Sequence, residues 1–346
     1  MSLTVTVQPS GHLLTVEDSE TILEAALRAG FVLAYGCTNG SCGQCKARVI
    51  GGEVREVRFH DYVLSARERQ AGFCLLCCTA PKKGGVVVYA ERARVGEIPV
   101  QSLTARVHKL ERFGAELAVL SLRTPRSQVL RFLPGQEVSL EFGGIKMQRL
   151  PVASCPCDGM HLRFHLRRQT GDAFSEWVFS RLRRADTVRI EGPWGRFSLD
   201  EASRRPILLI AYDTGFGPAS SLIEHAINIE LPQPMHLYWY APAPGQHYLD
   251  NQCRAWADAL DTLTYTPLVV APDLLPASDV AGASRSPRAC ETLNPVGHEI
   301  IGDHPELGDF DAYLIGPEAF RAAVKRLLLA NALPEGRLFE QTTRFE

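Results

Sequence analysis

Three cysteines stand close together near the start of the sequence, in the run CTNGSCGQC at residues 37–45. Cys37, Cys42 and Cys45 have the spacing C-x₄-C-x₂-C, which suits a [2Fe–2S] cluster whose fourth thiolate comes from further along the chain. Glycines within the run allow positive φ angles, which let amide N–H groups turn toward anionic sulfurs. The alternatives are a zinc site or three unrelated cysteines, but zinc is usually held by paired C-x₂-C units, and three cysteines in nine residues with glycines between them are rarely accidental. The spacing therefore predicts a [2Fe–2S] cluster.

The fourth cysteine ligand has three candidates, Cys74, Cys77 and Cys78, and spacing alone does not choose among them. The two that do not bind the cluster are expected to be small buried hydrophobic side chains. Cys155 and Cys157 flank a proline. A redox pair is one interpretation of them, and we favour ordinary core or loop thiols.

Composition and length limit the classes of function. A chain of 346 residues predicts two or three domains. Its net charge of −2 gives no argument for nucleic-acid binding. No apolar run reaches membrane-spanning length, and the N-terminal residues MSLTV lack the basic and then apolar pattern of a signal peptide. We therefore expect a cytoplasmic protein whose ten cysteines are reduced.

The first part of the chain has the pattern of a β-grasp sheet. Alternating apolar residues predict strands at 3–7, 12–17, 46–50 and 86–89. A helix is expected over residues 21–29, with Ser19 as its N-terminal cap and Gly30 as its stop. A charged segment, 91–102, follows and is interpreted as a linker.

The middle of the chain predicts a small antiparallel barrel. Short strands are expected at 103–110, 116–123, 136–142, 160–168 and 186–191. One helix fits residues 173–184, with Ser175 near its start.

The last part predicts a doubly wound parallel sheet. The run at 207–211 is apolar throughout, as in a strand buried on both faces. Further strands are expected at 235–240, 263–270, 311–315 and 337–340, alternating with helices at 219–229, 251–260 and 317–330. Residues 271–300 are expected to form a long loop.

Residues 72–77, GFCLLC, match the Gly-aromatic-x-Leu-x-Cys phrase of the ferredoxin domain of oxygenase reductases. Over residues 1–340 the chain resembles the NAD(P)H reductase components of multicomponent oxygenases, and also the related reductase that makes deoxysugars. The resemblance implies that Cys77 is the fourth ligand. It also implies a [2Fe–2S] ferredoxin domain at 1–95, an FAD-binding-type β-barrel at 100–203 and an NAD-binding-type α/β domain at 204–346.

The same resemblance implies an activity. In that family a hydride passes from NADH to FAD, which accepts two electrons. The flavin then releases electrons singly through the cluster to an oxygenase or hydroxylase partner.

The family holds FAD with an Arg-x-Tyr-Ser phrase and a Gly-x-x-Ser helix start. In one register Arg149 fills the arginine position; in the other, Leu150 and Pro151 replace the tyrosine and the serine. Ser175 retains the second serine, while Asp172 replaces the glycine, where its charge would face the pyrophosphate. Arg167 or Arg168 is a candidate to neutralise that charge, and Trp194, Tyr212 or Phe345 could replace the aromatic cover.

The nicotinamide motifs depart from the family in a similar way. Residues 212–218, YDTGFGP, retain Thr214, Gly215 and Pro218 of the family's Gly-Gly-Thr-Gly-x-x-Pro turn, and Gly316 remains from a Cys-Gly-Pro phrase. Residues 241–245 carry no arginine for a 2′-phosphate, which favours NADH over NADPH. The departures leave an alternative open: a flavin-free [2Fe–2S] electron-transfer or assembly subunit whose FAD and NAD sites have degenerated.

Overall fold

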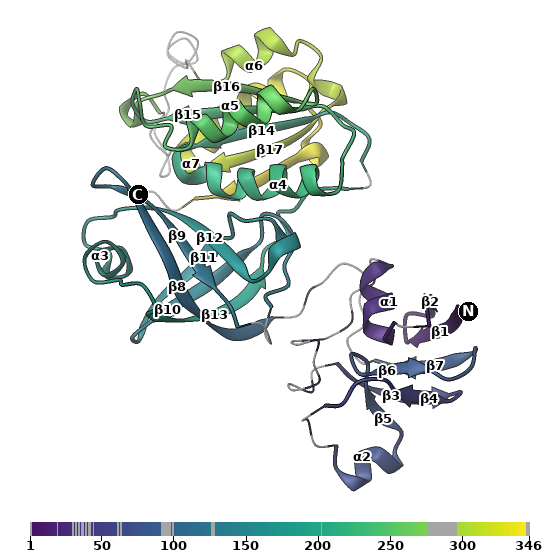
Figure 1. Ribbon diagram of the computed structural model, residues 1–346. Helices are drawn as coiled ribbons and strands as arrows, with labels where there is room; N and C mark the ends of the chain where they lie inside the picture. The colour runs from purple at the N-terminus through teal and green to yellow at the C-terminus, as the bar shows by residue number, and fades with distance from the viewer. Residues whose placement is uncertain are drawn as a thin grey trace, which may run out of the picture.

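A computed structural model of the chain shows three β-sheet units in succession (Figure 1). It describes residues 2–18, 20–29, 31, 33, 35, 38, 40, 43, 45–60, 62, 64–90, 98, 100–125, 129–201, 203–275 and 296–343. Among these residues no helix is long and apolar enough to cross a membrane.

The first unit is a β-grasp sheet, as predicted. Its strand order is β2-β1-β7-β3-β5, and a short pair, β4 and β6, lies beside it. The strands are β1 (Leu3–Gln8), β2 (His12–Val16), β3 (Lys46–Gly51), β4 (Val54–Glu56), β5 (Phe73–Leu75), β6 (Thr79–Pro81) and β7 (Val86–Tyr89). Helix α1 (Ile22–Arg28) packs buried Ile22 and Leu23 into the core, and the short α2 (Ala66–Gln70) lies at the far end of the unit (Figure 1).

The start of α1 corrects one expectation. Thr21, not Ser19, is the N-cap: its hydroxyl accepts the Glu24 N–H at 3.2 Å, and the Glu24 carboxylate accepts the Thr21 N–H at 2.9 Å. This reciprocal capping box satisfies two otherwise free N–H groups at once, which a cap two residues earlier could not do. Ser19 and Gly30 lie outside the described residues.

The second unit is a six-stranded antiparallel sheet curled into a nearly closed barrel, in the order β11-β10-β13-β8-β9-β12. Its elements are β8 (Gln101–Phe113), β9 (Leu117–Arg123), β10 (Glu137–Phe142), β11 (Ile145–Pro151), β12 (His161–Arg167), α3 (Ala173–Ser180) and β13 (Thr187–Trp194). The sequence pattern missed β11, and it extended α3 too far. The helix ends at Ser180; beyond it only Leu182 is buried in the barrel core, while Arg181, Arg183 and Arg184 are exposed.

The third unit is a five-stranded parallel sheet in the order β16-β15-β14-β17-β18. Its strands are β14 (Ile207–Tyr212), β15 (Met235–Ala241), β16 (Leu263–Val269), β17 (Asp311–Gly316) and β18 (Leu338–Thr342). Helices α4 (Phe216–Asn228) and α5 (Asp250–Ala259) cover one face, and α6 (His298–Asp303) and α7 (Glu318–Ala330) cover the other. The doubly wound prediction is confirmed, but α6 begins inside the segment expected to be a loop.

Cys155 and Cys157 correct a second expectation, because they are joined in a disulfide. Pro156 begins a short 3₁₀ turn that brings the two Cα atoms to 5.2 Å, within disulfide reach. The turn lies where the barrel meets α4, and the Cys155 N–H donates to Glu224 at 3.1 Å.

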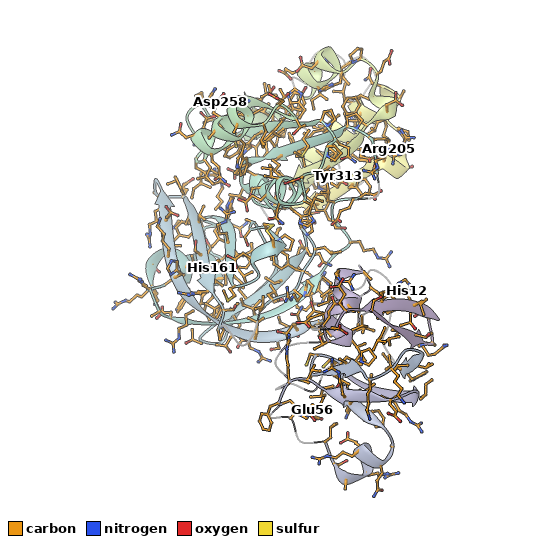
Figure 2. All side chains as sticks on the ribbon, turned by 45° about the vertical axis from the view of Figure 1, so that its right-hand side comes forward. His12, Glu56, His161, Arg205, Asp258 and Tyr313 are labelled. Carbon is orange, nitrogen blue, oxygen red and sulfur yellow. A yellow bond between two sulfur atoms is a disulfide. The ribbon has the colours of Figure 1, made fainter. Side chains whose placement is uncertain are left out.

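Polar contacts join the barrel to the parallel sheet, and side chains fill the space between them (Figure 2). The Ser220 and Ser221 hydroxyls of α4 donate to the backbone carbonyls of Ala153 and Ser154, at 2.7 and 2.8 Å. At the other end of the barrel, the Arg131 guanidinium lies beside the Tyr35 hydroxyl of the β-grasp unit. Burial raises the pKa of Tyr35 to about 12, and this arginine opposes part of the rise.

Candidate functional site

Two of the four predicted cluster ligands meet in the described part of the β-grasp unit. Cys45 precedes β3 and Cys77 follows β5, and these strands pair with Lys46 opposite Leu75. Both cysteines are buried, and their Sγ atoms are 3.3 Å apart. The strand register thus brings two thiols separated by 32 residues to one point.

The neighbouring cysteines differ from one another. Cys78 is fully buried, with its Sγ 3.6 Å from that of Cys77. Cys74 is half-buried, and burial raises its pKa to about 11. Cys37 and Cys42 lie outside the described residues, and within the described ones no three His, Cys, Asp or Glu side chains form a metal-binding group.

The loop around the cysteines has room only for glycine at two described positions. Gly40 and Gly43 have φ angles of 76° and 71°. A Cβ on Gly40 would lie 2.2 Å from the His60 Cβ, and one on Gly43 would lie 2.3 Å from the Tyr62 ring. A loop held this tightly, beside two converging thiols, fits a buried [2Fe–2S] cluster.

Replacing Gly43 with alanine is expected to lower the iron content to less than half of the wild-type value. The new Cβ would displace the Tyr62 ring, in addition to the strain of about 1–2 kcal/mol for a side chain at positive φ. Gly11→Ala is the matched control, because Gly11 has the same φ of 71° and nothing within 4 Å of its Cβ position. Equal iron per chain in the two variants, measured by chelation, would contradict the tight-loop argument.

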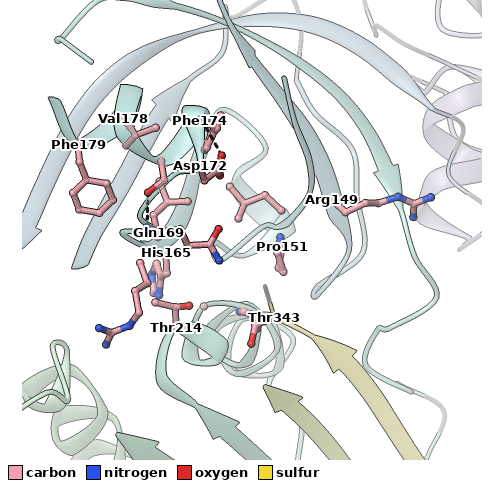
Figure 3. A pocket seen from close by; sticks show the side chains of 16 residues that line it. Arg149, Pro151, His165, Gln169, Asp172, Phe174, Val178, Phe179, Thr214 and Thr343 are labelled. Atoms are coloured by element: carbon pink, nitrogen blue, oxygen red, sulfur yellow. Dashed lines mark hydrogen bonds between the residues drawn. The ribbon is translucent and has the colours of Figure 1, made fainter. Parts of the chain in front are cut away.

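A second candidate site is the pocket between the barrel and the parallel sheet (Figure 3). Part of its wall is apolar. This part consists of Leu150, Pro151, Leu166, Phe174, Val178 and Phe179. Figure 3 shows Thr214 and Thr343 on the side next to the parallel sheet and Asp172 and Phe174 on the opposite side. The pocket contains most of the residues that the sequence suggested for FAD and NADH.

Arg149 borders this pocket but points away from it (Figure 3). Its guanidinium lies 5.3 Å from the centre of the Trp194 ring and 3.9 Å from the Glu137 carboxylate. Trp194 therefore packs on the arginine, and it does not line the pocket. Tyr212 does not line the pocket either, and Phe345 lies outside the described residues.

At the start of α3, two side chains of the protein itself accept hydrogen bonds from backbone N–H groups. The Asp172 carboxylate accepts the Phe174 N–H at 3.0 Å, and the Ser175 hydroxyl accepts the Gln169 N–H at 2.7 Å. An anion at this helix start would compete with Asp172 for the free amides and would be repelled by its charge.

Arg167 is paired with Asp213 rather than with Asp172. The Arg167 Nη2 and Nε donate to the two oxygens of the Asp213 carboxylate, the former at 2.7 Å. Asp213 is buried at a φ of 52°, in the turn where the family has glycine. A buried carboxylate needs a cationic partner, and a bidentate arginine is the strongest one available.

The retained nicotinamide residues converge at the ends of β14 and β17. Thr214 and Pro218 line the pocket, while Gly215 and Gly316 are not among its lining residues. A Cβ on Gly215 would lie 2.9 Å from the Ile315 carbonyl oxygen, so the two turns approach too closely for a larger residue. These glycines therefore have a packing role whatever binds in the pocket.

Among the pocket residues that sequence reasoning did not single out, two have unpaired polar atoms. The His165 Nε2 and the Thr343 Oγ1 are buried and have no hydrogen-bond partner among the described residues. The sequence pattern placed His165 in a strand and assigned no role to Thr343, so no local pattern singled them out. Buried polar groups are rarely left unpaired, so these two atoms indicate a ligand.

The pocket fits the ring of a flavin better than its diphosphate. Apolar walls and two unpaired polar atoms suit a flat heterocycle. The two described arginines of the pocket, Arg149 and Arg167, are engaged with acidic side chains, and Asp172 occupies the helix start.

Buried histidines predict a loss of stability in mild acid. Burial lowers the pKa of His165 to about 3, and burial together with the neighbouring His304 lowers that of His236 to about 4. The unfolded chain, with histidine pKa values of about 6.5, binds protons first as the pH falls. Between pH 7 and pH 5 each histidine should cost about 2 kcal/mol of unfolding free energy. Urea unfolding followed by tryptophan fluorescence measures this, and equal midpoints at both pH values would contradict it.

Comparisons with known proteins agree with this architecture. Residues 5–82 match the family model described as a 2Fe-2S iron-sulfur cluster binding domain. The CDP-6-deoxy-L-threo-D-glycero-4-hexulose-3-dehydrase reductase of Yersinia pestis is 30% identical over 98% of both chains. The phenol hydroxylase P5 protein of Acinetobacter pittii is 26% identical over 100% of this chain and 94% of that protein.

A solved structure shows the same fold along the whole chain. The Amycolatopsis cytochrome P450 reductase GcoB superposes with a TM-score of 0.59 at 24% identity and covers 99% of each chain. A full-length resemblance to reductases does not favour the alternative of a flavin-free subunit. The chain belongs to the family of electron-transfer reductases that carry a [2Fe–2S] ferredoxin domain, a family that includes the dehydrase reductase of Yersinia pestis.

Proposed function

We propose that this protein carries electrons from NADH through FAD and a [2Fe–2S] cluster to a separate acceptor protein, an oxygenase or hydroxylase component. The observation that carries the proposal is the convergence of buried Cys45 and Cys77 in a ferredoxin unit joined to a barrel and a parallel sheet. When bound, FAD would accept two electrons together and release them one at a time. The cytoplasm is the proposed location.

Within this proposal the metal ligands are Cys37, Cys42, Cys45 and Cys77. The ferredoxin domain is residues 1–95, the FAD-type barrel 100–203 and the NAD-type domain 204–346. The contact between the Cys45 and Cys77 sulfurs supports the second pair of ligands, because two thiolates on one iron must point to one place.

We assign the pocket between barrel and sheet to FAD and the nicotinamide together. Ser175, Thr214 and Pro218 line it, and the candidate residues Gly215 and Gly316 pack against Ile315 and Phe320 respectively. Arg149 and Arg167 are the candidate partners for the diphosphate, and each would have to leave an acidic side chain to reach it.

A dehydrase is a second candidate for the acceptor. Identity to the Yersinia pestis dehydrase reductase is 30%, above the 26% found with the phenol hydroxylase P5 protein. Reduction rates with a purified dehydrase and with a purified hydroxylase component would separate the two.

The test of the proposal is an absorption and EPR measurement on purified protein, followed by acid release of the cofactors. We expect cluster bands and, after reduction, a rhombic EPR signal from the purified protein, and flavin bands and NADH-dependent reduction of ferricyanide once FAD is supplied in excess. A protein that fails to take up either the iron–sulfur cluster or FAD would contradict it.

A further inference from the structure

The buried His165 is held from both sides of the pocket. It belongs to β12 of the barrel, and its Nδ1 lies 2.8 Å from the Tyr248 hydroxyl of the parallel-sheet unit. A Cβ on Gly217 of α4 would lie 3.2 Å from the His165 ring, so the helix packs closely against it. The ring of Phe216 lies 5.9 Å away, centre to centre. The imidazole therefore has little freedom to turn.

We assign the tautomer of His165 from its contact with Tyr248. Burial lowers the pKa of His165 to about 3, so the ring is neutral and carries one N–H. A phenol is the stronger acid of the two groups and a neutral imidazole nitrogen the stronger base, so Tyr248 donates and Nδ1 accepts. The remaining proton is then on Nε2, which becomes a donor.

This donor is unsatisfied. Nε2 is buried and has no partner among the described residues, although His165 lines a pocket with a largely apolar wall. Leaving such a group unpaired costs more than one ordinary hydrogen bond contributes, so its persistence points to an acceptor that belongs in the pocket.

We propose that His165 binds the flavin ring by donating its Nε2–H to a carbonyl oxygen or ring nitrogen, with Tyr248 as the positioning residue. The inference rests on the proposed function, because it takes FAD as the ligand of this pocket. It assigns flavin recognition to a residue that lies outside both FAD motifs. The flavin ring would then be fixed from the barrel and the parallel sheet together.

Titration of full-length protein with FAD, followed by flavin fluorescence, tests the proposal. His165→Phe keeps a flat ring but removes the donor, and the Kd for FAD should rise about tenfold. His165→Gln restores an N–H donor and should recover most of the affinity. Tyr248→Phe should weaken binding less and shift the flavin absorption bands, because the tautomer is no longer fixed.

His161→Phe is the matched control. His161 is an exposed histidine on the same strand, outside the pocket (Figure 2). It should leave both the Kd and the flavin spectrum unchanged.

Three outcomes would contradict either the inference about His165 or the proposed function, and each outcome identifies which of the two fails. If wild-type protein binds FAD and His165→Phe binds it equally well, the inference about His165 is wrong. If His165→Phe does not fold, unchanged affinity and spectrum in Tyr248→Phe overturn the inference instead. If wild-type protein binds no FAD at saturating concentration, the proposed function itself fails, whatever the variants do.

Discussion

Alanine in place of Cys45 or Cys77 is expected to remove most of the bound iron and the rhombic EPR signal of the reduced protein. Each of these thiols is buried, and their sulfurs point to one place, so losing either leaves an iron without a ligand. Cys37→Ala and Cys42→Ala are expected to have the same effect. Iron analysis and EPR on each variant measure it.

The neighbouring thiols supply the controls. Cys74→Ala and Cys78→Ala should keep both the iron and the signal. Because the Cys78 sulfur lies 3.6 Å from that of Cys77, Cys78 is the candidate to substitute when Cys77 is lost. The double variant Cys77→Ala/Cys78→Ala should therefore hold less iron than Cys77→Ala alone. Iron lost from Cys78→Ala but kept in Cys77→Ala would show that the assignment is reversed.

FAD should be bound weakly by the wild-type protein, lost on dialysis, and bound about 10- to 100-fold more tightly after Asp172→Gly. The change frees the amides at the start of α3 and removes a carboxylate that would repel a diphosphate by up to about 4 kcal/mol at 4 Å in a protein-surface dielectric. Glycine is itself an adequate N-cap, so the helix should lose only a few tenths of a kcal/mol. Equilibrium dialysis with FAD measures the affinity.

Two further variants sharpen this prediction. Adding Leu150→Tyr and Pro151→Ser should strengthen binding again, by restoring an aromatic cover and a hydroxyl. Asp158→Gly is the control, because this aspartate also accepts backbone N–H groups, from Met160 and His161, but lies outside the pocket. One tightly bound FAD in wild-type protein, retained through dialysis, would contradict the argument from Asp172.

The sequence predicts the elements well where the pattern is local and strong. Alternation located β1 and β2, and the apolar run located β14. It missed β11, whose residues were read as a displaced cofactor motif and not as a strand. Ser19 was expected to cap α1 because the prediction took account of a single side chain. The actual cap is the reciprocal pair of Thr21 and Glu24.

The candidate sites were less predictable because their contacts join distant parts of the chain. Arg167 and Asp213 are 46 residues apart, and His165 and Tyr248 are 83 apart. Each pair joins the barrel to the parallel sheet, so neither exists until the two have docked. The [2Fe–2S] domain was predictable because three of the four proposed ligands lie within nine residues, although the ligand assignment itself stays a prediction.

The contacts between the barrel and the parallel sheet also bear on how the protein moves. Arg163–Glu224, Arg167–Asp213 and the two serine hydroxyls of α4 cross the junction together. A hinge opening between the barrel and the parallel-sheet unit would break all of these contacts at once. The barrel and the parallel-sheet unit are therefore expected to move as one rigid body during turnover. A movement of the ferredoxin unit relative to the barrel would instead have to break the contact between Tyr35 and Arg131.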